Sequence, residues 1–322
     1  MNRRAAIMLL IAAMVAFAAS LLMPWNDLLA LARDDRRLAA LVLWELRFPR
    51  ALLSLVYGAM LGAAGAAIQA LFANPLASPD LTGTTSGAAF GAVVTAYLIG
   101  FSSPLALSLG SVAGALGALV LVLVLAGPRA ETATLLLAGL AISALAGALT
   151  TLALALAPSP FAFYDAYEWL MGSLIDRSLS QAAFATIPAV LSILLLMRLA
   201  TPLDRLALGE EVAQSLGHDI RRLRFQIVCL TAIGVGACVA VCGAIGFIGL
   251  VAPIFARKFS RGHPGRAIGP AALIGGILLL AADLLVREAP VGRTLPIGVI
   301  TALLGAPFFI WLVGRMRWRL AA

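Results

Sequence analysis

Charged residues are scarce in this sequence. Asp, Glu, Lys and Arg make up 12% of its 322 residues, whereas 62% are hydrophobic and the mean hydropathy is +1.03. Soluble globular domains carry about 25% charged residues, so this composition excludes one and predicts a polytopic membrane protein. Aromatic residues are also few, at 7%, while Ala, Leu and Gly abound. Small residues favour close helix contacts in lipid, whereas a β-barrel needs aromatic girdles, so we expect an all-α bundle.

Lysine occurs only once, as Lys258, between Arg257 and Phe259. A phosphate-binding loop needs Gly-Lys followed by Ser or Thr, so this chain has no such nucleotide site. We therefore expect no enzyme activity and no cofactor in this chain. If the protein uses ATP and magnesium, another chain must bind them. The net charge of +8 arises from arginines near span ends, so it does not indicate nucleic-acid binding.

Residues that usually hold metals or move protons are few. Cys229, Cys238 and Cys242 lie in one apolar run without a nearby His or carboxylate, so packing explains them better than a metal site. The apolar runs hold a single carboxylate, Asp283, four residues before Arg287, which predicts an ion pair. No series of buried acids suggests a proton relay.

The apolar runs predict about ten transmembrane helices, because one span needs about 20 residues. The first run also fits a signal peptide, but with further spans following we expect it to be retained. Residues 225–256 carry no charge and are punctuated by glycines and Pro253, which predicts a full span, a bend and a short span. Residues 25–44 are expected outside the membrane, and residues 158–177 in a loop with a short interfacial helix. The expected spans are 5–23, 51–72, 86–100, 104–126, 133–157, 181–199, the two within 225–256, 267–286 and 294–313.

Arginine placement predicts that both termini lie in the cytosol. With this orientation 15 of the 23 basic residues are inside, in agreement with the positive-inside rule. An unusual number of arginines then lies outside. These are Arg33, Arg36, Arg37, Arg47, Arg50, Arg177, Arg287 and Arg293.

The largest charged interruption is the segment Thr201–Arg224, which we call the polar island. It has a helical apolar stripe, and two glycines divide it into short helices. It is interpreted either as a solvated connector or as a docking element for a soluble partner. The stripe consists of Leu206, Ala207, Val212, Ala213 and Leu216, the glycines are Gly209 and Gly217, and Glu210 and Glu211 point elsewhere.

Several motifs along the chain resemble those of the FecCD/BtuC-type permeases of ABC importers, and they occur in the family's order. They are Arg47-Phe-Pro-Arg50, Gln69 with Asn74-Pro-Leu-Ala-Ser-Pro-Asp80, Gly83-Thr-Thr-Ser-Gly-Ala88, Trp169-Leu-Met-Gly-Ser173, Leu208-Gly-Glu-Glu-Val-Ala-Gln-Ser-Leu-Gly217, Gly246-Phe-Ile-Gly-Leu-Val-Ala-Pro253 with Arg257, Ala282-Asp-Leu-Leu-Val-Arg287, and Leu295-Pro-Ile-Gly-Val-Ile-Thr-Ala-Leu-Leu-Gly-Ala-Pro307. Each motif alone is weak, but the ordered set is specific and covers nearly the whole chain.

This resemblance implies one transmembrane permease domain over residues 1–322, with a BtuC-like bundle of ten helices. It further implies a homodimer in the bacterial inner membrane, two ATPase subunits inside, and a periplasmic or extracellular substrate-binding protein outside. The family imports iron–siderophore complexes, haem or vitamin B12, and the sequence does not say which of these is carried.

The resemblance also implies roles for particular residues. The polar island corresponds to the coupling helices that contact the ATPase, at about residues 201–224. The coupling residues are Leu206, Leu208, Gly209, Glu210, Glu211, Ala213, Leu216 and Gly217. Arg47, Arg50 and Arg287 correspond to arginines that receive carboxylates of the binding protein; headgroup anchoring is the alternative. Asn74 and Leu76 correspond to a cytosolic gate, where Pro75 and Pro79 prevent a continuous helix.

Two positions depart from the family's pattern. Ile254 stands where the family usually has His, and Thr294 stands where it usually has Glu. The second change makes the outer charge more positive, so the binding-protein contact is expected to differ. A secondary carrier for a small solute and a membrane assembly factor are the alternative functions. The first would need inverted repeats or intramembrane ionisable groups, and neither is clear here.

Overall fold

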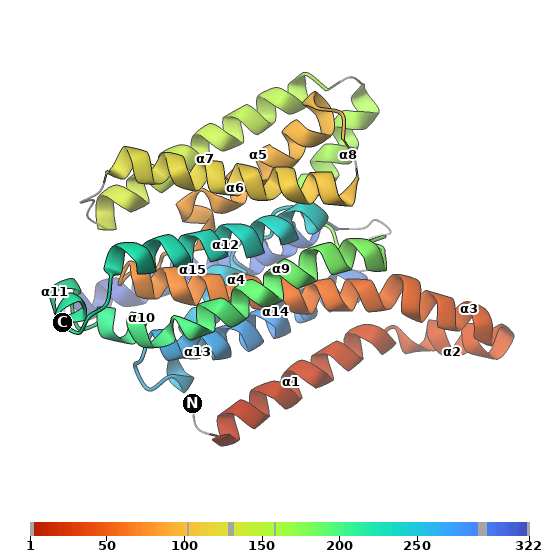
Figure 1. The fold of residues 1–322 in the computed structure, drawn as a ribbon. Coiled ribbons are helices and arrows are strands. Elements are labelled where there is room, and N and C mark those ends of the chain that lie inside the picture. Colours follow the sequence, from red (N-terminus) through yellow and green to blue (C-terminus); the bar gives the residue numbers. More distant parts are fainter. Residues whose placement is uncertain (1–2, 102, 128–131, 158, 289–294, 321–322) are drawn as a thin grey trace.

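The computed structural model describes residues 3–101, 103–127, 132–157, 159–288 and 295–320, and all regular elements in these ranges are helices (Figure 1). The long helices are α1 (Arg3–Leu22), α4 (Phe48–Leu71), α6 (Pro104–Ala126), α7 (Thr132–Ala155), α9 (Leu179–Arg198), α12 (Ile220–Cys242), α14 (Ile268–Glu288) and α15 (Ile297–Leu320). The shorter α-helices are α2 (Trp25–Asp34), α3 (Arg36–Leu41), α5 (Thr84–Val93), α8 (Pro160–Leu170), α10 (Ala200–Leu206), α11 (Glu210–Ser215) and α13 (Ile248–Ala256). The π-helical and 3-10 segments are η1 (Val42–Arg47), η2 (Pro79–Thr82), η3 (Val94–Leu98), η4 (Arg257–Phe259) and η5 (Gly265–Ala267).

Within the described residues, seven helices are long and apolar enough to cross a membrane. The other expected spans correspond to α5 with η3, to α13 and to α15, of which only residues 297–311 count as a shorter apolar helix. The all-α membrane fold is therefore confirmed, whereas the count of about ten spans holds only loosely.

Most of the segment 25–44, expected outside the membrane, is helical, and from Arg36 it runs without a break into the second expected span. α2 is a separate helix, but α3, η1 and α4 form one continuous helix from Arg36 to Leu71. Pro49 lies inside this helix rather than at its start. The π-helical η1 lies immediately before the proline, and Phe48 donates its N–H to Leu43 O, five residues back. Pro49 has no N–H to donate to the preceding turn, and the wider π-helical turn accommodates this missing hydrogen bond. The helix therefore does not end at Pro49.

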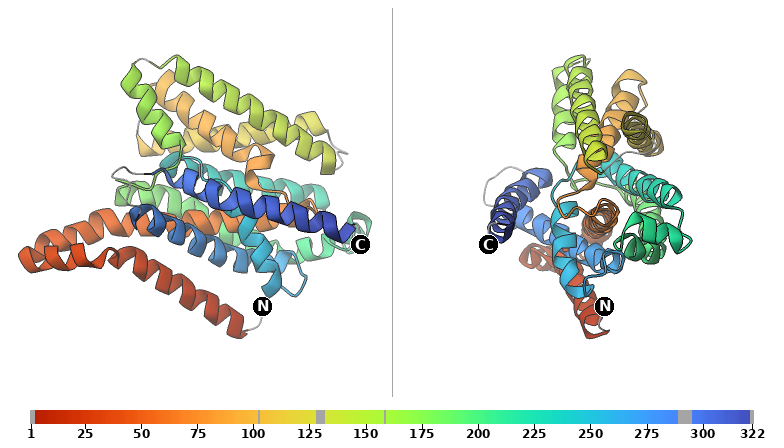
Figure 2. Two further views of the ribbon diagram at one scale, coloured as in Figure 1. Left: turned by 180° about the vertical axis from the view of Figure 1, so that it is seen from behind. Right: turned by 90° about the vertical axis from the view of Figure 1, so that its left-hand side faces the viewer.

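α4 is the central helix of the larger helical group, where it packs against α9, α12, α13 and α14; the end-on view shows it surrounded (Figure 2). Its small residues permit very close contacts. A Cβ at Gly62 would collide with the carbonyl oxygen of Ala271, and a Cβ at Gly65 with that of Gly249. The predicted small-residue packing is thus confirmed. α5, α6 and α7 pack together as a second group beside α12.

The predicted bend in residues 225–256 is also confirmed. α12 ends at Cys242, α13 begins at Ile248, and the backbone between them is not helical. The buried Tyr57 of α4 provides hydrogen-bond partners for backbone groups in this break. Its hydroxyl donates to Gly243 O (3.0 Å) and accepts from Ile245 N (3.3 Å). Ser173 N donates to Cys242 O at 2.8 Å. Irregular backbone at membrane depth needs such partners, because lipid offers none.

We expect Tyr57→Phe to lower the free energy of unfolding by about 1–3 kcal/mol, the cost of leaving buried polar groups unsatisfied. The measurement is the unfolding midpoint of the purified protein in mixed micelles. Tyr164→Phe is the matched control, because the Tyr164 side chain is exposed on α8. Equal stability of the two variants would contradict this role of Tyr57.

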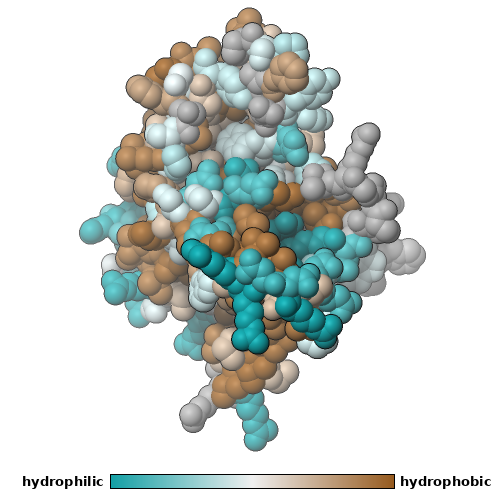
Figure 3. All heavy atoms as spheres, turned by 90° about the vertical axis from the view of Figure 1, so that its right-hand side faces the viewer, coloured by the Kyte–Doolittle hydropathy of each residue, from teal (hydrophilic) through white to brown (hydrophobic). Residues whose placement is uncertain are grey.

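The start of α1 and the end of α15 lie at the same end of the bundle as α10 and α11, and α2, α3 and α8 lie at the opposite end (Figure 1). Figure 3 views this opposite end: hydrophilic residues gather across its middle, and hydrophobic residues lie above and below them. The arrangement places the polar island and both ends of the described chain on one side of the bundle.

Candidate functional sites

The polar island forms two short helices, as predicted. α10 ends at Leu206, and α11 begins after Gly209, which has a φ of 114°. Gly217 follows α11 with a φ of 82°. Side chains rarely adopt these left-handed conformations, so the two glycines set the angle between the helices. Asp219 then caps α12 by accepting from Arg222 N at 3.0 Å.

The island is fixed to the rest of the chain on its inner face. Leu203 and Ala213 are fully buried. The Asp204 carboxylate accepts from Gly265 N at 2.7 Å and pairs with Arg266 at 3.5 Å. These contacts join α10 to the turn before α14.

The predicted apolar stripe is divided between two faces. Ala213 is wholly buried against its own chain, so it is not available to a partner, and Leu206 is partly buried. The other members of the stripe, Ala207, Val212 and Leu216, are exposed, and the exposed Leu208 lies near them in the chain. The exposed fractions of Leu208, Val212 and Leu216 are 67%, 43% and 51%. The division arises because only one side of a six-residue helix can face the bundle.

Charge on the island's outer face is divided as well. Glu210 lies 3.8 Å from Arg224 in a loose ion pair. Glu211 is exposed and makes no ion pair among the described residues. The outer face therefore offers apolar side chains beside a free carboxylate.

The predicted gate segment is a compact turn between α4 and η2. The Asn74 side chain accepts from Leu76 N at 2.9 Å, and Asn74 N donates to Gln69 O at 3.1 Å. Asn74 and Leu76 are both partly buried. The absence of a continuous helix beyond Leu71 follows the prediction from Pro75 and Pro79. Whether the turn closes a pathway stays a prediction.

Two polar groups support this turn. Gln69 donates to Leu250 O of α13 and accepts from Arg257, both at 3.2 Å. Burial lowers the pKa of Arg257 from its ordinary value. Asp80 ends the motif at residues 74–80, and no role was predicted for its carboxylate. It lies near Gly246 in the break before α13, and burial raises its pKa. The sequence feature that could have indicated Asp80 is a carboxylate next to an uncharged, proline-flanked segment.

We expect Leu76→Ala to raise passive leak through the reconstituted protein or to uncouple ATP hydrolysis from transport. The physical reason is that a shorter side chain widens a constriction formed by an otherwise rigid turn. Liposome leak and ATP use per transported solute are the measurements. Leu125→Ala, on the exposed face of α6, is the control. Wild-type leak and coupling in Leu76→Ala would show that Leu76 does not form the gate.

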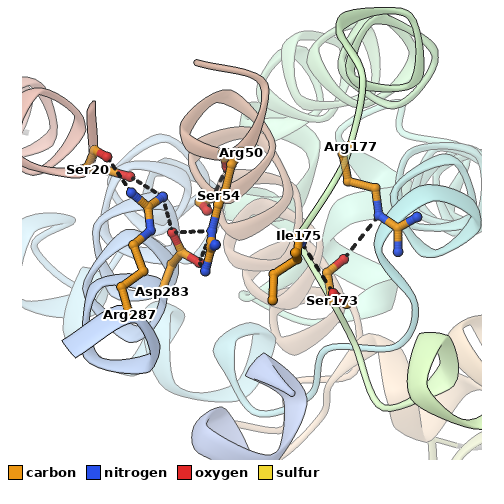
Figure 4. Close-up of polar contacts among 8 residues, drawn as sticks. All are labelled: Ser20, Arg50, Ser54, Ser173, Ile175, Arg177, Asp283 and Arg287. Carbon is orange, nitrogen blue, oxygen red and sulfur yellow. Dashed lines mark hydrogen bonds and ion pairs between the residues drawn. The ribbon is translucent and has the colours of Figure 1, made fainter. Parts of the chain in front are cut away.

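Two of the arginines expected outside, Arg50 and Arg287, form a cluster around Asp283 (Figure 4). The Asp283 side chain is 1% exposed, and it pairs with Arg50 at 2.8 Å and with Arg287 at 2.6 Å. The predicted Asp283–Arg287 ion pair is thus confirmed, with Arg50 as an additional partner. Arg287 also donates to Ser20 O at 2.6 Å, which attaches α1 to α14.

The third predicted docking arginine, Arg47, also binds its own chain. Its guanidinium donates to Leu22 O at 3.0 Å and to Pro24 O at 3.3 Å, at the end of α1. Only 9% of the Arg287 side chain is exposed. Two of the three guanidinium groups therefore share one buried carboxylate, and the third binds carbonyl oxygens at the end of α1. Whether these arginines receive carboxylates of a binding protein stays a prediction. One positive charge of the Arg50–Asp283–Arg287 cluster remains in excess. Arg177 lies apart from the cluster.

Of the two positions that depart from the family's pattern, Ile254 lies within the described residues and Thr294 does not. Ile254 is partly buried in α13. Thr294 and Arg293 lie outside the described residues. Cys238 and Cys242 are fully buried, as expected for packing residues.

A second feature is an apolar groove of about 660 Å³ between α15, the end of α8 and the break after α12. Its lining includes Leu170, Ala244, Gly298 and Ala302, without a charged side chain. α15 lies on the side of the bundle opposite α9 (Figure 2). The groove and the exposed face of α15 give the chain a wide apolar surface distinct from the island.

Comparison with known proteins agrees with this arrangement. Residues 6–315 match the FecCD transport family. The chain is 40% identical to the vitamin B12 import system permease protein BtuC of Vibrio cholerae, covering 85% of this chain and 83% of that protein. It is 38% identical to the Fe(3+) dicitrate transport system permease protein FecD of Escherichia coli, covering 86% of each. An inward-facing metal-chelate type ABC transporter superposes with a TM-score of 0.84 at 28% identity, covering 97% of this chain and 99% of that one.

The helical membrane fold and these relatives define the permease subunit of an ABC importer. The chain belongs to the FecCD transport family.

Proposed function

We propose that this permease carries an iron chelate, such as a siderophore complex or haem, or cobalamin, across the bacterial inner membrane. Its relatives named for vitamin B12 and for ferric dicitrate support this substrate class. The groove beside α15 supports it too, because apolar walls without charged ligands suit a large chelate whose metal is already coordinated.

Two apolar surfaces support a second copy of this chain and an ATPase as the proposed partners. The exposed face of α15, with Leu303, Leu304 and Ile310, supports a homodimer whose two copies enclose the substrate pathway. A binding protein delivers substrate at the end where α2 and α3 lie, and two ATPases bind at the polar islands. The chain contributes no catalytic group to ATP hydrolysis.

The observation that carries this proposal is the polar island. Leu208, Val212 and Leu216 are exposed on a segment that is fixed to the bundle through Asp204 and Ala213. A solvated connector needs neither feature. An apolar surface on a fixed support suits a groove in a second protein.

The test is uptake into proteoliposomes that contain the permease, its ATPase and its binding protein. We expect ATP-dependent accumulation of a ferric chelate or of cobalamin, and none with the ATPase omitted. Uptake driven by an ion gradient without ATPase would instead support the secondary-carrier alternative.

The proposed orientation has the island and both termini in the cytosol. A cysteine at Arg36 should react with a membrane-impermeant maleimide added outside intact cells, whereas one at His218 should react only after permeabilisation. The reason is the excess of basic residues on the island's side. Labelling in the opposite sense would reverse the arrangement.

A further inference from the structure

A second groove, of about 370 Å³, lies between the last turn of α9 and the first turns of α12. No function described above uses it. Its walls are mainly apolar, and its polar groups come from one arginine, one glutamine and one thiol. The lining residues used below are Leu195, Arg198, Phe225, Gln226, Cys229 and Leu230.

Positive charge gathers at the end of this groove near the polar island. Arg198 is exposed in the last turn of α9, and Arg222 is exposed one helical turn before Gln226 on α12. Neither arginine makes an ion pair within the described part of the chain. The nearby Arg224 is already paired with Glu210. Asp219 is the carboxylate close in sequence, and it caps the helix through Arg222 N.

The groove opens on a surface suited to lipid. α9 exposes Leu191, Leu194 and Met197 along the face that leads to it. α9 lies on the side of the bundle opposite α15, whose exposed face is the surface proposed for the second copy (Figure 2). A groove that is apolar along its length and basic at the end of a span matches the headgroup boundary of a bilayer.

We propose that this groove binds one anionic phospholipid. Its phosphate is held by Arg198 and Arg222, because guanidinium groups bind phosphate with two charge-assisted hydrogen bonds. Gln226 donates to the headgroup, and an acyl chain lies along Leu195, Phe225 and Leu230. A zwitterionic lipid carries no net charge to neutralise the two arginines, so it should occupy the groove less than an anionic lipid does.

A lipid bound in this groove would affect how the polar island is attached to the bundle. The chain leaves α9 at Arg198 and enters α12 at Ile220, so the polar island is attached to the bundle through these two helices. A lipid that bridges them holds the two attachment points together. This consequence rests on the proposed coupling function, whereas the binding itself does not.

Cys229 provides a probe of the groove. It is partly exposed and lines the groove, whereas Cys238 and Cys242 are fully buried. The full-length protein is placed in phosphatidylcholine nanodiscs with or without phosphatidylglycerol, and the rate of Cys229 alkylation by a lipid-permeant maleimide is measured. We expect phosphatidylglycerol to slow alkylation severalfold. Cys229→Ser supplies the background rate.

The Arg198→Gln/Arg222→Gln variant should lose this protection, and native mass spectrometry should show its affinity for phosphatidylglycerol lowered roughly tenfold or more. Arg261→Gln, which removes an exposed charge from the turn after η4, should behave as wild type. Equal rates with and without phosphatidylglycerol, or protection retained in the double variant, would overturn the proposal. Protection that depends on the number of chains per disc instead of on lipid would assign the groove to a second copy. These measurements need no ATPase, so their failure leaves the proposed transport function untouched.

Discussion

Replacing Asp283 by alanine should lower the free energy of unfolding by about 3–5 kcal/mol, the cost of breaking a buried ion pair and leaving its partner charged. The effect is large because two cations depend on this one carboxylate. Arg50 and Arg287 are 19% and 9% exposed, so water compensates little when the carboxylate is removed. Their mutual repulsion then adds to the lost attraction. α1 should separate first, because Arg287 holds Ser20.

The measurement is denaturant-induced unfolding of the purified protein in mixed micelles, with protease sensitivity of the α1–α2 junction as a second readout. Asp219→Ala is the matched control, because it removes an exposed aspartate whose cap is worth about 1 kcal/mol. Asp283→Asn should lie between alanine and wild type, since it keeps an acceptor without the charge. A double-mutant cycle with Arg287→Leu should give a coupling energy well above zero. A loss no larger than that of Asp219→Ala would show the cluster to be merely peripheral.

This cluster also changes how binding-protein docking should be tested. Changing Arg47, Arg50 and Arg287 to glutamate would bring new carboxylates beside the buried Asp283 and would break the joint between α1, α4 and α14. Loss of docking in such a variant would then report misfolding. The sequence predicted the Asp283–Arg287 pair from their spacing of four. It did not predict Arg50, because the contact joins residues that are 233 positions apart.

The same distinction between local and distant contacts runs through the fold. Glycine and proline spacing predicted the bend after Cys242, the turn at Asn74 and the two short helices of the island, because each depends on backbone conformation at a few adjacent residues. The continuous helix through Pro49 was missed, since proline near apparent polar flanks usually marks a helix start. Tyr57 was missed for a different reason: a tyrosine in an apolar run gives no sign of the distant backbone it satisfies.

The island shows where periodicity reaches its limit. A helical stripe identifies the residues on one face, but it does not say which neighbouring body that face meets. Ala213 faces the chain's own core, while Leu208 and Leu216 face outward. An arginine at Ala213 would therefore damage the island's attachment and would not report the partner contact. A test of coupling must change the outward residues and leave Ala213 in place.

Changing both Leu208 and Leu216 to aspartate should abolish ATP-driven transport while leaving the permease folded. The two side chains are 67% and 51% exposed, so their replacement removes little buried area from this chain. At the centre of a protein interface, loss of such apolar anchors costs about 2 kcal/mol or more, which is roughly 30-fold in ATPase affinity. Added negative charge beside the free Glu211 would repel an acidic groove and alter contact with a basic one.

Gly217→Val should uncouple by a different route. The φ of 82° at Gly217 disfavours a β-branched side chain, although no atom lies within 4 Å of the position a Cβ would take. The strain therefore changes the island's shape without a collision in the core. Gly117→Val is the matched control, because Gly117 has the same open surroundings in helical α6.

ATPase co-purification, ATP hydrolysis and uptake in proteoliposomes are measured for each variant. We expect both island variants to lose ATPase binding or its coupling to uptake, and Gly117→Val to retain them. Wild-type binding and uptake in the Leu208/Leu216 variant would mean that the island only connects α9 to α12. Another surface of the permease would then have to make the contact that couples ATP hydrolysis to transport.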